Sequence, residues 1–275
     1  MGLRINTNTA SVNAQRNLTG STNALQRSFE RLSSGLRITR ASDDAAGLAI
    51  SERLRSQVRS YQQAQRNSLD GISLLQVAEG ALNETSGILV RLRELAIQSA
   101  NGTLGVSERT AVNGEFQDLI AEITRVANVT EFNGTKLLDG TALTVTFQVG
   151  ANNTANDQIA VTGVDATATG VGVAALAVDT QANAQTALTA IDLAITNVAG
   201  KRAGFGTAQN RLESTIRSIA VAVENTSAAE SRIRDVDVAS ETANLTRNQV
   251  LQQAGIAVLA QANVASQNAL QLLRG

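Results

Sequence analysis

Two short motifs in this 275-residue chain contain residue types that could do chemistry. Asp43 and Asp44 are adjacent carboxylates, which could hold a cation or exchange a proton. Gly204-Phe205-Gly206 resembles part of a phosphate-binding loop, but it lacks the full spacing and a preceding strand. The aspartates fit the start of a helix better, and the glycines fit a turn between two helices. We therefore predict no catalytic, cofactor or metal site at either motif.

The composition argues against an enzyme. The chain has no His, no Cys and one Tyr, so most side chains that act as nucleophiles, general bases or metal ligands near neutral pH are missing. Hydrophobic residues make up 43% and aromatic residues 2%, which predicts a core of Ala, Leu, Val and Ile. The chain also has no Pro, as suits long helices, because each internal Pro would cost about 3 kcal/mol.

Charge is unevenly distributed along the chain. The formal net charge is -1, and residues 137–200 contain no Lys or Arg. This argues against nucleic-acid binding and predicts a neutral to acidic middle. No apolar run is long enough to span a membrane, and the first residues lack the apolar segment of a cleaved signal peptide. We expect no membrane insertion, and either a cytoplasmic protein or export without a cleaved signal.

A first helix is predicted from about Ser11 to Leu36. Gly35 can supply a left-handed helix end. Beyond it, Ser42 can cap a second helix, while Asp43 and Asp44 place negative charge at the positive end of that helix. A turn or an extended spoke should separate the two helices. The apolar residues of the first helix share one face: Leu18, Leu25, Phe29, Leu32 and Leu36.

The second helix is predicted from about Ser42 to Gln98, and a third from about Ser107 to Ala127. Asn101-Gly102 separates them. Apolar residues of the second helix fall on a heptad grid, which is typical of packed helical rods: Tyr61, Leu75, Leu82, Leu89 and Ala96. Those of the third share one side: Phe116, Leu119, Ile120 and Ile123.

The middle of the chain changes to a period of two. Leu143, Val145 and Phe147 alternate with polar residues, which predicts a half-buried strand. A second strand is predicted at 158–161, so the two should form a hairpin. Residues 162–180 have no strong period, and we expect a short surface loop with one turn of helix.

Helices return at residues 182–199 and 208–273, with a break predicted around 200–206. The opposite side of the last helix also carries apolar residues, such as Val250 and Ile256. A helix that is apolar on more than one side needs more than one partner, so we expect further copies of the chain to cover it in an open helical array. Its main apolar stripe is Leu251, Ala254, Val258, Ala262, Ala265, Ala269 and Leu272.

Several segments resemble, in order, those of bacterial flagellins: INTNTAS, ERLSSGLRI, ASDDAAGLAI, DGISLLQVAEGALNE, RLRELAIQSANGT, EFNGTKLLDG and QANVASQNALQLLRG. They lie within residues 1–140 and 201–275. The resemblance implies a mainly α fold, a long antiparallel helical rod or coiled coil with paired N- and C-terminal helices and a small β-hairpin. About 60 residues separate the matching regions, so this would be a short form lacking most of the outer variable domains.

The implied domains are an inner coiled-coil core domain from residues 1–41 and 233–275, and a helical rod domain from residues 42–140 and 181–232. Residues 141–180 would form the β-hairpin and a short surface-exposed variable segment. The polymerisation core is expected to include Leu18, Leu25, Phe29 and Leu32 on the first helix, and Leu251, Ala254, Val258, Ala265 and Leu272 on the last.

The resemblance implies a structural subunit of the extracellular flagellar filament, secreted by type III export and used for swimming. Implied partners are further copies of the chain, the export apparatus, an export chaperone at the C-terminal region, and the filament cap and hook-filament junction proteins. Arg91, Leu95 and Glu115 match positions at which flagellins contact a Toll-like innate immune receptor, although Val90 stands where Gln is usual. Helix packing would explain these three residues equally well.

Two alternatives remain at this point. A hook-filament junction protein resembles flagellin at its ends but usually has fewer of the matching segments. A cytoplasmic coiled-coil adaptor would explain the apolar stripes but not the neutral, β-prone middle. No cofactor is expected for any of the three.

Overall fold

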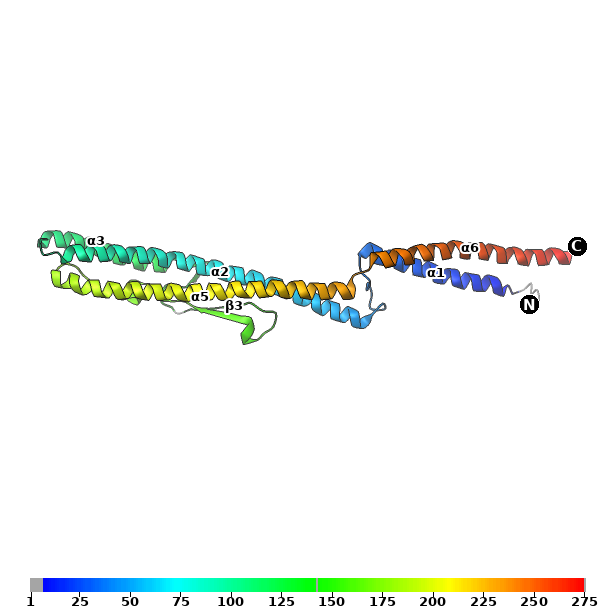
Figure 1. The fold of residues 1–275 in the computed structure, drawn as a ribbon, viewed down its shortest axis with the longest axis horizontal. Helices are drawn as coiled ribbons and strands as arrows, with labels where there is room; N and C mark the ends of the chain where they lie inside the picture. The colour runs from blue at the N-terminus through cyan, green and yellow to red at the C-terminus, as the bar shows by residue number, and fades with distance from the viewer. Residues whose placement is uncertain (1–6, 142, 275) are drawn as a thin grey trace. The chain divides into compact units, whose positions relative to one another are not determined.

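The computed structural model describes residues 7–141 and 143–274, with the side chains of 265–274 left out of the description. Two compact units appear: a rod unit of residues 57–224, and a terminal unit made of the residues up to Ser56 and from Asn225 onward. The chain is mainly α-helical, as predicted (Figure 1). The helices are α1 (Thr9–Ser34), α2 (Ala45–Ala100), α3 (Val106–Val129), α4 (Ala168–Val171), α5 (Gln181–Arg234) and α6 (Val238–Arg274); the strands are β1 (Glu131–Phe132), β2 (Thr135–Lys136), β3 (Thr144–Gln148) and β4 (Gln158–Thr162).

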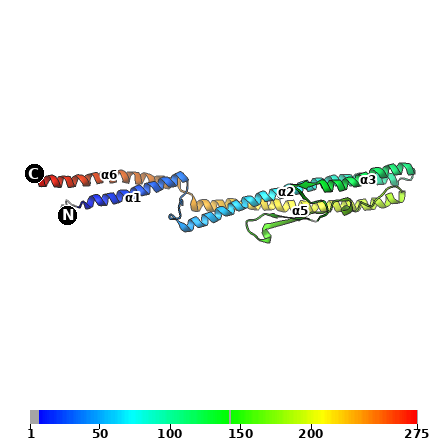
Figure 2. The ribbon, with the colours of Figure 1, turned by 180° about the vertical axis from the view of Figure 1, so that it is seen from behind.

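The rod unit is built on α2, α3 and α5, which lie side by side in both ribbon views (Figures 1 and 2). The heptad grid predicted on α2 is confirmed, because four of its members are 0% exposed: Leu75, Leu82, Leu89 and Ala96. Ser68, which fills the gap in that grid, is also 0% exposed and donates its hydroxyl to Ala64 O at 2.8 Å. A buried hydroxyl satisfied within its own helix does not interrupt the packing seam.

The break predicted around Gly200–Gly206 was wrong, since α5 runs through it. Val198, Phe205 and Leu212 are spaced by seven residues and are at most 3% exposed, so one buried seam continues through the glycines. Gly71 of α2 lies opposite: an added Cβ there would be 3.1 Å from Phe147 and 3.2 Å from Leu212. The missing side chain therefore lets α5 and the β3–β4 hairpin approach α2 closely.

The helix is interrupted further on, where we had predicted a continuous one: α5 ends at Arg234 and α6 begins at Val238. Asp237 explains the new start, because its carboxylate accepts hydrogen bonds from Ala239 N at 3.0 Å and Ser240 N at 3.3 Å. These two amides lie in the first turn of α6 and have no partner within the helix.

The β3–β4 hairpin is confirmed, with Thr144 opposite Thr162 and Gln148 opposite Gln158. The surface loop predicted for 162–180 was wrong apart from its single helical turn, α4. Half of its ten apolar side chains belong to the buried core of the rod unit, since Ala166, Ala168, Val171, Val173 and Val178 are at most 3% exposed. An irregular segment buries these residues without any period that the sequence could show.

Side chains from the helices hold this buried segment. Lys201 of α5 donates its ammonium group to Asp165 O and to Gly170 O, the latter at 3.1 Å. Ser99 of α2 donates to Val178 O, and Asn113 of α3 accepts from Val178 N at 2.9 Å. The backbone groups that the irregular segment buries are thus partly satisfied by the surrounding helices.

A second hairpin, β1–β2, was not predicted. Its turn residues Asn133 and Gly134 have φ of 50° and 75°, the geometry that the Asn-Gly pair favours in a two-residue hairpin. The signal was present in the sequence, but strands of two residues have no readable alternation.

Candidate assembly site

The terminal unit pairs the two ends of the described chain. Helices α1 and α6 lie side by side and antiparallel (Figures 1 and 2). Near the start of α1, Asn8 donates to Ala262 O at 2.9 Å and Ser11 donates to Asn263 at 3.0 Å. Near the other end of the pair, Ser28 donates its hydroxyl to Glu241 Oε1 at 2.5 Å.

Each helix turns one heptad seam toward the pair. Buried or half-buried side chains recur at alternating steps of three and four, which places them on one line of each helix. On α1 they are Ser11, Ala14, Leu18, Ser21, Leu25, Ser28 and Leu32, and on α6 they are Glu241, Leu245, Asn248, Gln252, Gly255, Leu259 and Ala262. The seam of α6 is mostly small or polar.

Apart from Ala262, which belongs to the seam, the described residues of the apolar stripe predicted on α6 lie elsewhere on the helix. Leu251 is 50% exposed, Val258 is 58% exposed, and Ala254 is also exposed. On α1, Leu18, Leu25 and Leu32 are half-buried in the pair, whereas Phe29 is 52% exposed. The side chains of Ala265 and Leu272 lie outside the described residues, although both belong to α6.

These exposed side chains belong to a larger set of large hydrophobic residues. In the terminal helices they are Val12 and Phe29 of α1, and Val238, Val250, Leu251, Ile256, Val258 and Val264 of α6, each at least 44% exposed. A set of exposed apolar side chains as large as this one marks an interaction surface. Sequence reasoning located the α6 stripe but did not show that α1 packs against a different line of residues.

The junction between α1 and α2 uses both aspartates structurally. Gly35 ends α1 with φ of 72°, as predicted. Asp44, rather than Ser42, caps α2: its carboxylate accepts from Gly47 N at 2.8 Å and its carbonyl accepts from Leu48 N at 3.0 Å. The aspartate directly before the helix is the residue whose carboxylate reaches the free amides of the first turn.

Asp43 holds the preceding loop together. Its carboxylate accepts from Thr39 N at 3.3 Å, Thr39 Oγ1 at 3.0 Å and Arg40 N at 3.1 Å. Desolvation by the neighbouring chain would raise the pKa of Asp43, but the hydrogen bonds from Arg40 and Thr39 outweigh it and hold that pKa below its ordinary value. Neither aspartate is therefore placed as a metal ligand or a catalytic acid.

The three residues matched to receptor contact lie in the rod unit but have different environments. Arg91 donates to Glu115 from Nε at 3.0 Å and from Nη2 at 2.8 Å, and to Glu94 at 2.9 Å. The hydrogen bond to Glu115, with that to Glu94, raises the pKa of Arg91. Leu95 is 1% exposed and belongs to the core, so in this conformation a protein ligand could touch Arg91 and Glu115 but not Leu95.

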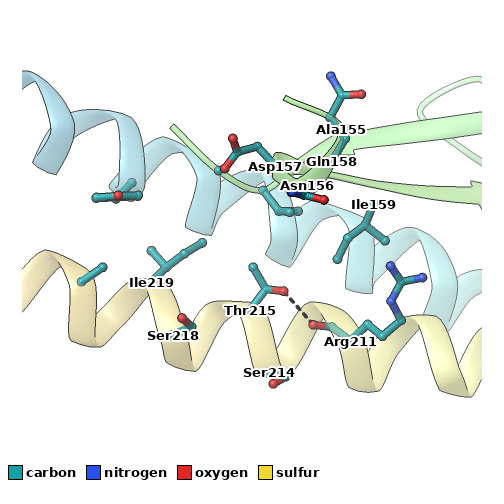
Figure 3. Close-up of a pocket in the computed structure, with 14 residues that line it drawn as sticks. Ala155, Asn156, Asp157, Gln158, Ile159, Arg211, Ser214, Thr215, Ser218 and Ile219 are labelled. Atoms are coloured by element: carbon teal, nitrogen blue, oxygen red, sulfur yellow. Dashed lines mark hydrogen bonds between the residues drawn. The ribbon is translucent and has the colours of Figure 1, made fainter. Parts of the chain in front are cut away.

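A groove of about 540 Å³ runs between the tip of the β3–β4 hairpin and α5 (Figure 3). Its lining includes Tyr61, Asp157, Arg211 and Thr215. The hydroxyl of Thr215 is used within its helix, donating to Arg211 O at 2.9 Å. The groove contains no pairing of a nucleophile with a base. Among the described residues, no three His, Cys, Asp or Glu side chains gather as metal ligands, and no helix is long and apolar enough to cross a membrane.

Long packed helices, with large apolar side chains exposed on both terminal helices, are typical of a self-assembling structural protein. Residues 5–143 match the family model for the bacterial flagellin N-terminal helical region, and residues 188–273 match that for the C-terminal helical region. The chain therefore belongs to the bacterial flagellin family. It is a structural subunit of the extracellular flagellar filament, which this family uses for swimming motility.

Known proteins resemble it over nearly their whole length. A flagellin of Halalkalibacterium halodurans is 52% identical, with 98% of this chain and 99% of the relative covered. A flagellin of Bacillus subtilis is 45% identical, with 99% and 100% covered. The crystal structure of Bacillus cereus flagellin is similar at 32% identity and a TM-score of 0.51, covering 56% of this chain and 88% of the other.

Proposed function

We propose that the terminal helices are the surface through which this flagellin polymerises. The observation that carries the proposal is the stripe of Leu251, Ala254 and Val258, which is apolar but exposed because α1 packs on another line of α6. A neighbouring copy would remove this surface from water, at about 25 cal/mol for each Å² of apolar area. Phe29 of α1 would be covered in the same step.

Two surfaces that differ from one another join subunits head to tail, which gives an open helical array when the rotation between neighbours does not close. The terminal unit offers such a pair, with Phe29 on α1 and the Leu251–Val258 stripe on α6. The rod unit has a continuous core of its own and would keep its fold in the free subunit. The terminal helices would become fully ordered only when neighbours cover them, because ordering costs roughly 1–2 kcal/mol per residue.

The further partners follow from the family and from the accessible surfaces. We infer contacts with the export apparatus, with an export chaperone at the C-terminal region, and with the filament cap and hook-filament junction proteins. Recognition by a Toll-like innate immune receptor would use Arg91 and Glu115, which are exposed and paired, with Leu95 supporting α2 from inside. We infer no enzymatic activity, since the chain has neither His nor Cys.

The proposed polymerisation surface is tested by Val258→Asp. Burial of an unpaired carboxylate would cost several kcal/mol at every subunit added, so we expect at least a 100-fold slower elongation of filament seeds. The free subunit should keep its circular dichroism, because Val258 is 58% exposed there. Elongation is measured by light scattering and electron microscopy, and bacteria carrying the variant should not swim.

The matched control is Val258→Leu, which keeps the surface apolar and should elongate seeds at a rate close to that of the unchanged chain. Normal growth of the Val258→Asp variant would remove the C-terminal helix from the subunit interface and contradict the proposal.

A further inference from the structure

The register of the α1–α6 pair requires an explanation, because the seam of α1 nearly repeats after seven residues. Leu18, Leu25 and Leu32 are one heptad apart, and so are the small residues Ala14, Ser21 and Ser28. Sliding α1 by seven residues, about 10 Å at 1.5 Å per residue, would place leucine on leucine and small residue on small residue. On α1, the apolar pattern alone therefore does not select one alignment.

Polar contacts at the two ends of the pair differ from one heptad to the next, as those of Asn8 and Ser11 do, but inside the buried seam one charged cluster breaks this repeat. Glu241 is 8% exposed and is the only buried charged residue among the described side chains. Its Oε1 accepts from Ser28 at 2.5 Å, and its Oε2 lies 3.7 Å from Arg31 Nη1. The carboxylate also lies in the first turn of α6, where the helix dipole favours negative charge.

A slip of one heptad cannot reproduce these contacts. In one direction Ser21 replaces Ser28, but Ala24 replaces Arg31, so the buried carboxylate loses its cation. In the other direction Gly35, which already ends α1, comes opposite Glu241. Leaving a buried charge without its partner is strongly unfavourable, and single polar groups in paired helices are known to select one register for this reason.

We propose that Ser28, Arg31 and Glu241 are positioning residues that fix the register of the α1–α6 pair. The register decides which residues of α1 lie beside the exposed α6 stripe. A fixed register therefore gives every subunit the same terminal surface. This inference concerns the pairing within one chain and goes beyond the proposed polymerisation surface.

Disulfide bonds can report the register directly, because the chain has no cysteine. An ideal Cβ on Gly255 lies 3.8 Å from the Cβ of Leu18, which is within the range for a disulfide. The pair Leu18→Cys with Gly255→Cys therefore reports the native register. In the slip that brings Ser21 to Glu241, Ser11 takes the place of Leu18, so Ser11→Cys with Gly255→Cys reports that slip. In the opposite slip Leu25 takes that place, so Leu25→Cys with Gly255→Cys reports it.

The three cysteine pairs are oxidised in filaments diluted with unchanged subunits, because the terminal helices are fully ordered there and the dilution suppresses bonds between chains. With Glu241 intact, only the 18–255 bond should form. With Glu241→Leu, the 11–255 bond should increase roughly 10- to 100-fold, the factor that corresponds to one hydrogen bond to a charged group. Mass spectrometry of the proteolytic peptides measures each bond.

Thr242→Leu is the matched control, since it introduces the same side chain at the next, exposed position and should leave only the 18–255 bond. If Glu241→Leu also gives only the 18–255 bond, other contacts set the register and the proposal is overturned. Loss of all three bonds would mean that the helices separate rather than slip, which also overturns it. A chain that keeps the 18–255 bond but fails to elongate seeds would count against the proposed polymerisation surface instead.

Discussion

In the rod unit, α2 buries Leu75, Leu82 and Leu89 completely, whereas in the terminal unit α6 leaves Leu251 at 50% and Val258 at 58% exposure. Both helices carry apolar stripes in the sequence. The difference lies in the number of helices available to cover them. Helix α2 packs with α3, α5 and the buried segment before α5, whereas α6 packs only with α1 among the residues that the structure describes. An apolar stripe in the sequence thus indicates a buried surface without saying whether the same chain or another copy covers it.

The two units also use polar groups differently. The rod unit uses them to satisfy buried backbone, as Lys201 does for the carbonyls of Asp165 and Gly170. The terminal unit places a carboxylate, Glu241, inside the helix seam itself. Apolar packing defines the rod unit, and polar contacts define the alignment of the terminal unit.

A cavity in the rod core should have the largest effect on the stability of the free subunit. Leu82→Ala removes a side chain that is 0% exposed, so we expect a loss of about 2–5 kcal/mol in the free energy of unfolding, measured by urea denaturation. Leu69→Ala on the same helix is the control, because Leu69 is 49% exposed. Equal losses in the two variants would show that α2 is not packed in this register.

Loss of the Lys201 ammonium group should have a smaller effect. Lys201→Met leaves two backbone carbonyls without their donor, and we expect a loss of about 1–3 kcal/mol together with faster amide exchange in residues 163–178. The matched control is Lys136→Met, since Lys136 is the only other lysine of the chain. Its Nζ donates to Asn128 O at 2.6 Å in an exposed hydrogen bond. It should cost less than about 1 kcal/mol, and an equal cost would contradict the role given to Lys201.

The smallest expected effect is that of low pH on the loop between α1 and α2, which the Asp43 carboxylate holds together. Because the pKa of Asp43 is lower in the folded chain than in the unfolded chain, its carboxylate stabilises the loop above the ordinary aspartate pKa of about 3.9 and ceases to do so as the pH falls through the folded value. The protection of the Thr39 and Arg40 amides in filaments, measured against the intrinsic exchange rate at each pH, should therefore fall at acid pH. Asp43→Asn should remove this dependence, and an unchanged acid response would reject the assignment.

The rod could be predicted from sequence where packing is periodic. The heptads of α2 and the alternation around Val145 each repeat several times, and each repeat points to the same buried face. The buried segment at 163–178 could not be predicted, because its burial depends on pockets made by helices distant in the sequence. The continuity of α5 was missed because glycine was given more weight than the seam of Val198, Phe205 and Leu212.

The assembly site could be predicted only in part, because the spacing of apolar residues shows a stripe but not what covers it. Leu251 and Val258 were found by their spacing, but spacing does not identify the partner. The seam that α6 turns toward α1 contains Asn248, Gln252 and Gly255, which an apolar search passes over. Its regular step of three and four residues was the signal that could have revealed it.

The central claim is that the rod unit folds alone, whereas the terminal helices become fully ordered only when neighbouring subunits cover them. Hydrogen exchange in the free subunit and in the assembled filament tests this claim most directly. In the free subunit, amides of α2 around Leu82 should already be protected, while those of α6 around Val258 should exchange quickly. After assembly, protection around Val258 should rise by at least 100-fold and that around Leu82 should change little. Equal protection of the two regions in the free subunit, or no gain around Val258 on assembly, would contradict the account.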